Sequence, residues 1–234
     1  MREYSHCYFA LLDLLGFKEI VKTKTCSEIV DIFEEAKKRY IVNQVKDDNS
    51  EAPVISPEDI HYYFMSDSVC IYINDDIPSA LPVLAWLCMN FQVRMLCLDT
   101  PLFVRGSLSR GDIYEDHNVL FGPAMVEAYL RGEKLAHVPR VIMPANLYDE
   151  ITNISDKALL NGFINPEHDG FYAINYINYF CKHNSTLRYR ENVNNYIRNI
   201  LSVSLDQSVR EKYLYVKSWM EYYYSQEKVK THEQ

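Results

Sequence analysis

A run of five aliphatic and aromatic residues near the start of the chain, YFALL at positions 8–12, is the strongest constraint on the fold. The run is too short to form a helix of its own. Its lack of polar alternation is typical of a strand that is buried on both faces. Such a strand belongs to a sheet with helices packed against it. The run ends at Asp13, so a carboxylate follows directly after the buried strand.

Strand and helix patterns alternate along the rest of the chain. Strands are predicted at 8–12, 60–65, 69–73, 102–108, 119–121, 140–143 and 171–177. Helices are predicted at 17–23, 27–42, 80–98, 123–135, 145–151, 186–201 and 206–224. An exposed loop is predicted at 43–57 and a turn at 110–112. This order predicts an α/β (α+β) fold, a mixed sheet with flanking helices and a C-terminal helical extension.

The length of 234 residues predicts one domain. We expect its core to span residues 1–145. Its C-terminal part, one strand and an α-rich extension, is expected to span residues 146–234.

The charge balance limits the partners of the chain. Acidic residues outnumber basic ones by 32 to 24, and the net charge of -8 argues against nucleic acid and anionic membranes as partners. The apolar stretch at 81–98 is interrupted by polar residues, which predicts a buried helix rather than a membrane span. The N-terminal residues lack a signal-peptide pattern, and the six cysteines lack zinc-type spacing. We therefore expect a cytoplasmic protein with reduced thiols.

Asp13 and Asp67 are candidate metal ligands. Asp67 stands in a Ser-Asp-Ser step between two strand-like runs, where a β-hairpin is predicted. Each residue has an ordinary alternative role: Asp13 could cap the helix that begins near Gly16, and Asp67 could make local turn hydrogen bonds. If their strands are neighbours in one sheet, both carboxylates reach the same edge. Two oxygen ligands there suit Mg²⁺ or Mn²⁺.

Four segments of the chain resemble class III nucleotidyl cyclase catalytic domains in their order and spacing. They are FALLDLLGF at 9–17, FMSDSV at 64–69, VRGSLSRG at 104–111 and LFGPAMVEAY at 120–129. The resemblance covers about residues 6–145, and the segments with Asp13 and Asp67 are its most specific parts. Within this class the chain is similar to the compact bacterial branch that includes the pyrimidine cyclases of Pycsar antiphage defence. The segments PRVI at 139–142 and DGFY at 169–172 resemble that branch more weakly.

The resemblance implies a two-metal cyclisation, in which the ribose 3′-hydroxyl of a nucleoside triphosphate attacks the α-phosphate and pyrophosphate leaves. Asp13, Asp67 and Leu14 would hold two Mg²⁺ or Mn²⁺ ions. Backbone donors from Leu14 to Phe17, which include those of Leu15 and Gly16, would receive the triphosphate. The resemblance also implies a homodimer with active sites at its interface, and a separate effector that reads the cyclic nucleotide.

Two positions depart from the purine-selective members that the chain resembles. Those members have a lysine four residues before the second metal aspartate, and an aspartate near the strand that precedes the later glycine. Tyr63 and Val119 occupy these places. Neither provides the usual pair of donor and acceptor for adenine, and a tyrosine narrows the pocket. The substitutions therefore favour a pyrimidine base, and UTP and CTP both stay open.

The transition-state asparagine and arginine of the family also have no clean match. A one-residue shift of the motif places Glu127 and Arg131 there, where Arg131 could stabilise phosphate charge or could be a solvated helix residue. Arg105 and Arg110 are further candidates for phosphate charge, with surface salt bridges as the alternative. Two other functions stay open: an adenylate or guanylate cyclase, and a catalytically degenerate module that binds a nucleotide or dimerises.

Overall fold

The computed structural model describes residues 3–42, 55–203 and 205–232. Its strands are β1 Ser5–Leu15, β2 His61–Met65, β3 Ser68–Asn74, β4 Phe103–Asp116, β5 Val119–Phe121, β6 Val141–Pro144, β7 Ile164–Pro166 and β8 Phe171–Ile174. They form one sheet in the order β2-β3-β1-β4-β6-β8-β7, with β5 paired to β4. The β4–β6 pair is parallel and the other pairs are antiparallel. The predicted mixed sheet is confirmed.

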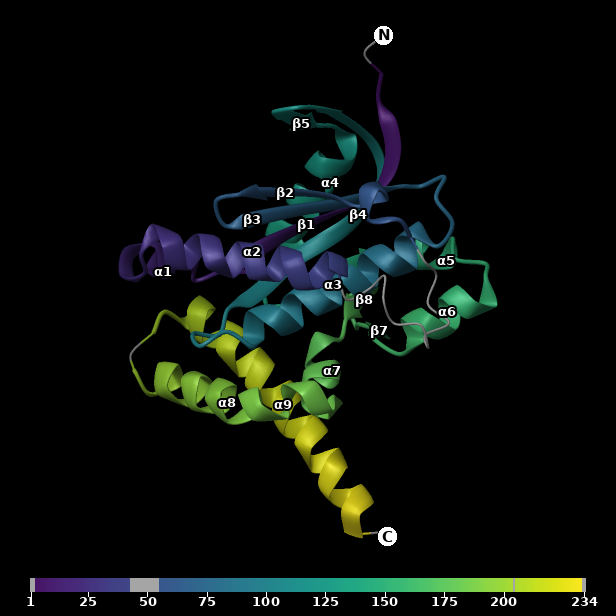
Figure 1. Ribbon diagram of the computed structural model, residues 1–234. Coiled ribbons are helices and arrows are strands. Elements are labelled where there is room, and N and C mark those ends of the chain that lie inside the picture. Colours follow the sequence, from purple (N-terminus) through teal and green to yellow (C-terminus); the bar gives the residue numbers. More distant parts are fainter. Residues whose placement is uncertain (1–2, 43–54, 204, 233–234) are drawn as a thin grey trace.

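Helices cover this sheet and extend beyond it. They are α1 Phe17–Thr23, α2 Cys26–Val42, α3 Ala80–Leu96, α4 Pro123–Leu135, α5 Ala145–Asp149, α6 Ile154–Asn161, α7 Tyr176–Lys182, α8 Leu187–Ser202 and α9 Gln207–His232. Short 3-10 turns lie at Pro57–Asp59 and Asn184–Thr186. In Figure 1, α1, α2 and α3 lie on one face of the strands β1 to β4, and α4 lies on the opposite face. The helices α7, α8 and α9 pack together and form the predicted C-terminal extension.

The central strand β1 is buried on both faces, as its apolar run predicts. Ala10, Leu12 and Leu14 belong to the large core cluster that includes α3. Phe9 and Leu11 belong to a second, smaller cluster that includes residues of α4. Successive side chains of a strand point to opposite faces. An uninterrupted apolar run therefore meets a helix on each side of the sheet.

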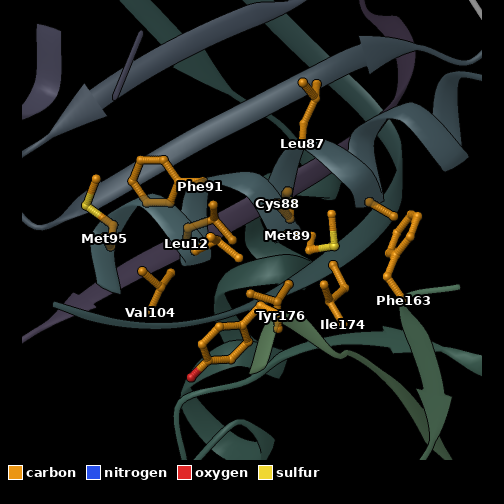
Figure 2. Close-up of a cluster of buried hydrophobic side chains, with 14 of the residues drawn as sticks. Leu12, Leu87, Cys88, Met89, Phe91, Met95, Val104, Phe163, Ile174 and Tyr176 are labelled. Atoms are coloured by element: carbon orange, nitrogen blue, oxygen red, sulfur yellow. The ribbon is translucent and has the colours of Figure 1, made fainter. Parts of the chain in front are cut away.

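Helix α3 forms the centre of the core (Figure 2). Fourteen of its residues are buried, which leaves no polar face of the kind that a surface helix has. Its residues Leu87, Phe91 and Met95 belong to the same buried cluster as Leu12 of β1 and Val104 of β4. The prediction of a buried helix at this stretch is confirmed. In the described ranges of the chain, no helix is both long enough and apolar enough to cross a bilayer.

The predicted turn at 110–112 is wrong, because β4 continues through it to Asp116. Gly111 pairs with Cys7 of β1 and lies under α4, where a Cβ atom would stand 3.6 Å from the Cβ of Ala124. A glycine in a strand marks either a turn or a close approach of another backbone. Here it accompanies the close packing of α4, so the strand is not interrupted.

The C-terminal part differs from the prediction in three places. The strand predicted at 171–177 ends at Ile174, and α7 begins at Tyr176 after Asn175, whose side chain accepts a hydrogen bond from the amide of Asn178. The helix α6 and the edge strand β7 were not predicted. Of the loop predicted at 43–57, residues 43–54 lie outside the described residues.

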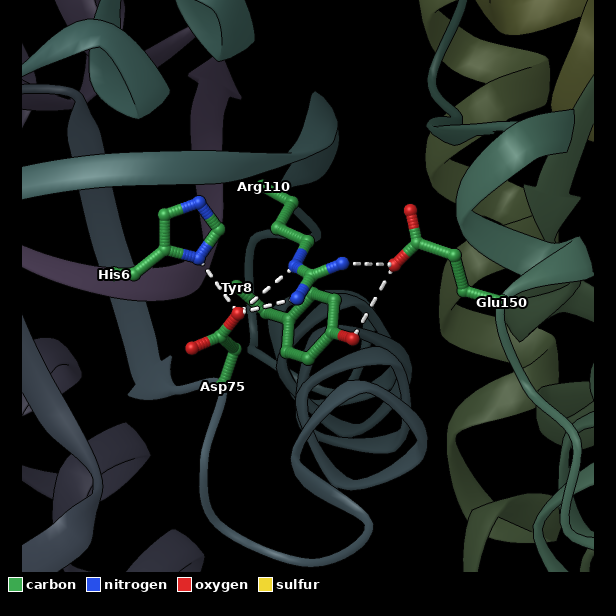
Figure 3. Close-up of polar contacts among 5 residues, drawn as sticks. All are labelled: His6, Tyr8, Asp75, Arg110 and Glu150. Carbon is green, nitrogen blue, oxygen red and sulfur yellow. Dashed lines mark hydrogen bonds and ion pairs between the residues drawn. The ribbon is translucent and has the colours of Figure 1, made fainter.

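An ionic network fastens the start of β1 to three other elements (Figure 3). The Arg110 guanidinium on β4 donates to Asp75, after β3, at 2.9 and 2.6 Å, and to Glu150, after α5, at 2.8 Å. His6 lies 2.6 Å from the same Asp75 oxygen, and the Arg110 guanidinium stands over the Tyr8 ring. Burial raises the pKa of Asp75, but the contacts with Arg110 and His6 outweigh it and hold the pKa below its usual value. Arg110 thus makes the salt bridges that were the alternative to a phosphate-binding role.

Candidate active site

The register of β1 and β3 brings Asp13 and Asp67 together. Asp13 lies opposite Ser68, and the backbone N–H of Leu14 donates to the carbonyl of Asp67 at 2.8 Å. Adjacent strands lie about 5 Å apart. The two aspartates therefore occupy neighbouring positions at one edge of the sheet, although 54 positions separate them in the sequence.

Asp13 does not cap helix α1. The N-cap residue of α1 is Gly16, which has φ +86° and no side-chain cap hydrogen bond. Instead, the Oδ2 atom of Asp13 accepts a hydrogen bond of 2.6 Å from Nε of Arg105, which lies opposite it on β4. The capping alternative is thus wrong, and the carboxylate near the buried strand is compensated by a cation.

Asp67 lies in the exposed turn between β2 and β3, after Ser66 in a left-handed conformation at φ +56°. Its carbonyl is engaged with Leu14, but within the described part of the chain its carboxylate has no hydrogen bond and no ion pair. The alternative of local turn hydrogen bonds by this side chain is therefore not realised. The carboxylate is open to a ligand.

This donor set fits a hard divalent cation. Three or more His, Cys, Asp or Glu side chains placed for a metal are absent from the residues that the structure describes. Mg²⁺ and Mn²⁺ do not need such a cluster, because one or two carboxylates commonly bind them together with phosphate oxygens and water. Asp13 and Asp67 provide two carboxylates, one of them without a partner among the described residues. The Leu14 side chain is buried, so only the backbone of Leu14 can reach an ion.

The segment after Asp13 presents backbone amides at the same edge. The amide of Leu14 is already bonded to Asp67, so the expectation that it donates to a triphosphate is wrong. Leu15 lies opposite Phe103 in the β1–β4 ladder. The amides of Gly16 and Phe17 have no acceptor among the described residues. The Phe17 ring is buried and packs near the Phe33 ring, with centroids 5.7 Å apart, so this residue offers only its backbone to a ligand.

Arg105 is held by two acids. Besides Asp13, its Nη2 atom donates to Glu133 of α4 at 2.6 Å. Burial lowers the pKa of Arg105, but the pairing with Asp13 and Glu133 outweighs this effect and raises the pKa above its usual value. The sequence pattern offered a surface salt bridge as the alternative role for this arginine. The structure shows a salt bridge that reaches a candidate metal ligand.

Tyr63 and Val119 lie near a residue that the sequence reasoning missed. The Tyr63 hydroxyl donates to Glu115 on β4, and Nδ1 of His61 lies 3.2 Å from the other Glu115 oxygen. Burial and the Glu115 carboxylate raise the pKa of Tyr63 to about 12. Glu115 lies opposite Leu120 in the β4–β5 hairpin, next to the half-exposed Val119. Glu115 gave no sequence signal, because Tyr63 is 52 positions away in the chain, and β3 and β1 separate β2 from β4 in the order of the sheet.

Glu127 and Arg131 pair with each other on α4 and do not join the aspartates. The Arg131 side chain is 14% exposed and donates to the carbonyl of Leu108 at 2.7 Å, so the alternative of a solvated helix residue is wrong. Leu108 is three residues beyond Arg105 on β4, or about 10 Å along the strand. Within one chain, Arg131 therefore lies on a different part of the sheet from Asp13. It lines a polar pocket of about 230 Å³ together with Ser109, Arg110 and Asn146.

Comparisons with known proteins show the fold. No protein-family model matches the chain, and no curated protein sequence matches it. Among solved structures, the chain is similar to the catalytic core of a rhodopsin-guanylyl cyclase with converted specificity, in complex with ATPαS. The TM-score is 0.50 at 10% sequence identity, over 74% of this chain and 96% of that one. The chain has the fold of a nucleotidyl cyclase catalytic core.

Proposed function

We propose that the chain is a nucleotidyl cyclase that converts a pyrimidine ribonucleoside triphosphate, UTP or CTP, to its 3′,5′-cyclic monophosphate and pyrophosphate. The observation that carries the proposal is the register of β1 and β3. It sets Asp13 beside Asp67 at a sheet edge, in a fold shared with a cyclase catalytic core. The structure of that core holds ATPαS, a nucleoside triphosphate analogue.

Each residue at this edge has a role that its chemistry supports. Asp13, Asp67 and the backbone of Leu14 would hold two Mg²⁺ or Mn²⁺ ions. When bound, such ions supply activation of the ribose hydroxyl and neutralisation of charge on the leaving pyrophosphate. The amides of Gly16 and Phe17, at the end of β1 after Leu15, would donate to the triphosphate.

Base selection is proposed to rest on Tyr63, Val119 and Glu115. Tyr63 and Val119 stand where the purine-selective members that the chain resembles have a lysine and an aspartate. Tyr63 offers a ring face, and its partner Glu115 offers a carboxylate acceptor. The exocyclic amino group of cytosine and the N3–H of uracil can each donate to a carboxylate. A pyrimidine therefore has partners at this position, and the product assay distinguishes the two bases.

A second copy of the chain is proposed to complete each site. Arg131 and Glu127 lie away from the aspartates of their own chain, so in this proposal they would act on the aspartates of a second chain. Large apolar side chains are exposed on β5 and α4, an arrangement typical of an interaction surface; they are Val119, Phe121, Val126, Tyr129 and Leu130. Burial of this surface in a two-fold homodimer would carry the α4 of one chain toward the aspartates of the other.

Complementation tests the shared site directly. Chains with Asp13→Asn and chains with Arg131→Ala are each expected to be inactive. When the two are unfolded and refolded together, half of the dimers are mixed and have one intact site, which restores about a quarter of the wild-type activity. Matched refolding of each variant alone is the control. A mixture as inactive as its components contradicts the shared site.

The function itself is tested by product analysis. The chain is incubated with each of the four ribonucleoside triphosphates and Mn²⁺, and the products are identified by mass spectrometry. Cyclic CMP or cyclic UMP supports the proposal. Cyclic AMP or cyclic GMP identifies a purine cyclase, and no product with any nucleotide identifies a binding module. Asp67→Ala should abolish turnover without loss of the folded state, because Asp67 lies in an exposed turn outside both core clusters.

A role in signalling follows from the same proposal. The cyclic nucleotide would act as a second messenger on a separate effector protein, in antiphage defence. This role rests on the resemblance to pyrimidine cyclases. In cells that express the effector, the Asp67→Ala variant should lose phage protection together with the cyclic nucleotide. Protection that persists without the nucleotide contradicts the role.

A further inference from the structure

The candidate metal ligand Asp13 has a protein cation as its partner. Arg105 lies between two acids, with Nε 2.6 Å from Oδ2 of Asp13 and Nη2 2.6 Å from Oε1 of Glu133. Asp13 comes from β1 and Glu133 from α4, so one guanidinium connects the sheet edge to the helix. A divalent ion that binds Asp13 has to compete with this guanidinium for the carboxylate.

Close packing of α4 on β4 brings Glu133 to this place. A Cβ atom on Gly132 would stand 3.8 Å from the Cα of Gly106, so the two backbones approach closely at this point. Gly132 precedes Glu133 on the helix, and Gly106 follows Arg105 on the strand. This contact between α4 and β4 places the side chains of Arg105 and Glu133 next to each other.

The two acids differ in their surroundings. The Asp13 side chain is 29% exposed and lies at the sheet edge next to Asp67, whereas the Glu133 side chain is 50% exposed. The Arg105 side chain is 18% exposed, so a guanidinium without any acid would lose solvation without compensation. Glu133 is available as that acid, because Arg105 is its ion-pair partner and it has no other among the described residues.

We infer that Glu133 is a positioning residue for the metal site, and that it acts through Arg105. In the absence of a divalent ion, Arg105 neutralises Asp13. When an ion binds, Arg105 gives up Oδ2 of Asp13 and stays paired to Glu133. This inference rests on the proposed function, because it concerns the same metal ligands.

The two charges have opposite effects on ion binding. Removal of the Arg105 charge by Arg105→Gln takes away the competitor and should tighten Mn²⁺ binding about tenfold. Removal of the Glu133 charge by Glu133→Gln leaves Arg105 with Asp13 as its only acid, and should weaken Mn²⁺ binding about fivefold. Because Glu133 acts through Arg105, Glu133→Gln should have no effect once Arg105 is replaced.

The experiment measures Mn²⁺ binding to the full chain without nucleotide, by the electron paramagnetic resonance signal of free Mn²⁺. The variants are Arg105→Gln, Glu133→Gln and the double variant, with Glu191→Gln on the exposed face of α8 as the control for a charge removed elsewhere. The expected result is an effect of Glu133→Gln in the wild-type background alone. If Arg105→Gln does not fold, Arg105→Met replaces it, because methionine also removes the charge and keeps an unbranched side chain that can pack in its place.

The outcomes separate this inference from the proposed function. If Glu133→Gln weakens Mn²⁺ binding equally in the wild-type and the Arg105→Gln backgrounds, Glu133 acts on the ion directly through its charge. That result overturns the inference and leaves the proposed function intact. Unchanged Mn²⁺ affinity in Glu133→Gln also overturns it. A wild-type chain that does not bind Mn²⁺ overturns both the inference and the proposed metal site.

Discussion

The network around Arg110 predicts a measurable loss of stability on Asp75→Asn. Asp75 is 14% exposed and accepts from Arg110 at 2.9 and 2.6 Å and from His6 at 2.6 Å. Hydrogen bonds to charged groups contribute about 1.5–3 kcal/mol each. Because Arg110 is 37% exposed and keeps Glu150, we expect a net loss of about 2 kcal/mol. For a chain of this size that lowers Tm by about 4–8 °C.

Urea unfolding of Asp75→Asn, Arg110→Met and the double variant measures the pair directly. A coupling energy of about 1–2 kcal/mol is expected between the two sites. Asp31→Asn on α2 is the control for an exposed aspartate. A coupling energy near zero, or a loss in Asp75→Asn below about 0.5 kcal/mol, would refute the reasoning.

The pH dependence gives a second check on Asp75. Its pKa in the folded chain is below the usual value of 3.8, so its contribution is complete above that value and disappears as the pH falls through the folded pKa. The stability difference between the wild type and Asp75→Asn should therefore shrink as the pH falls below 3.8 and through the folded pKa of Asp75. A difference that stays constant over that range contradicts this assignment.

Three further predictions follow from packing, from the base pocket and from the metal ligands. Gly106→Ala places a Cβ atom 2.2 Å from the Leu11 carbonyl oxygen, and should lower the free energy of unfolding in urea by more than about 3 kcal/mol. The control is Gly111→Ala, whose Cβ atom would have its nearest neighbour at 3.6 Å. It should lower the free energy of unfolding by less than about 1 kcal/mol. In the ultraviolet absorbance titration, Tyr63→Phe should lack the phenol that ionises near pH 12 in the wild type. The stability that the Tyr63 hydroxyl gains from its bond to Glu115 is complete below pH 10 and disappears as the pH rises toward 12. EDTA should abolish turnover and shift Tm by less than about 2 °C, because Asp13 and Asp67 lie outside both core clusters.

Local patterns in the sequence determined the central architecture. The apolar run of β1 requires cover on both faces, and α3 and α4 provide it. The nearly continuous apolar character of α3 determined that it lies inside. Asp13 was distinguishable because a carboxylate at the end of a buried strand has an energetic cost, which does not depend on the rest of the fold. Asp67, in a predicted hairpin turn, was distinguishable only in combination with Asp13.

Only the tertiary structure decided what surrounds those aspartates. Arg105 and Glu133 are 28 residues apart, and they meet because α4 packs closely on β4. Glu115 belongs to the part of β4 beyond Gly111, and it contacts Tyr63 although β3 and β1 separate their strands in the order of the sheet. A glycine gives the same sequence signal in a turn as in a strand that lies under a closely packed helix. An acidic residue gives the same signal whether it faces solvent or pairs with a residue far away in the sequence. Such contacts depend on how elements pack, which the local sequence does not encode.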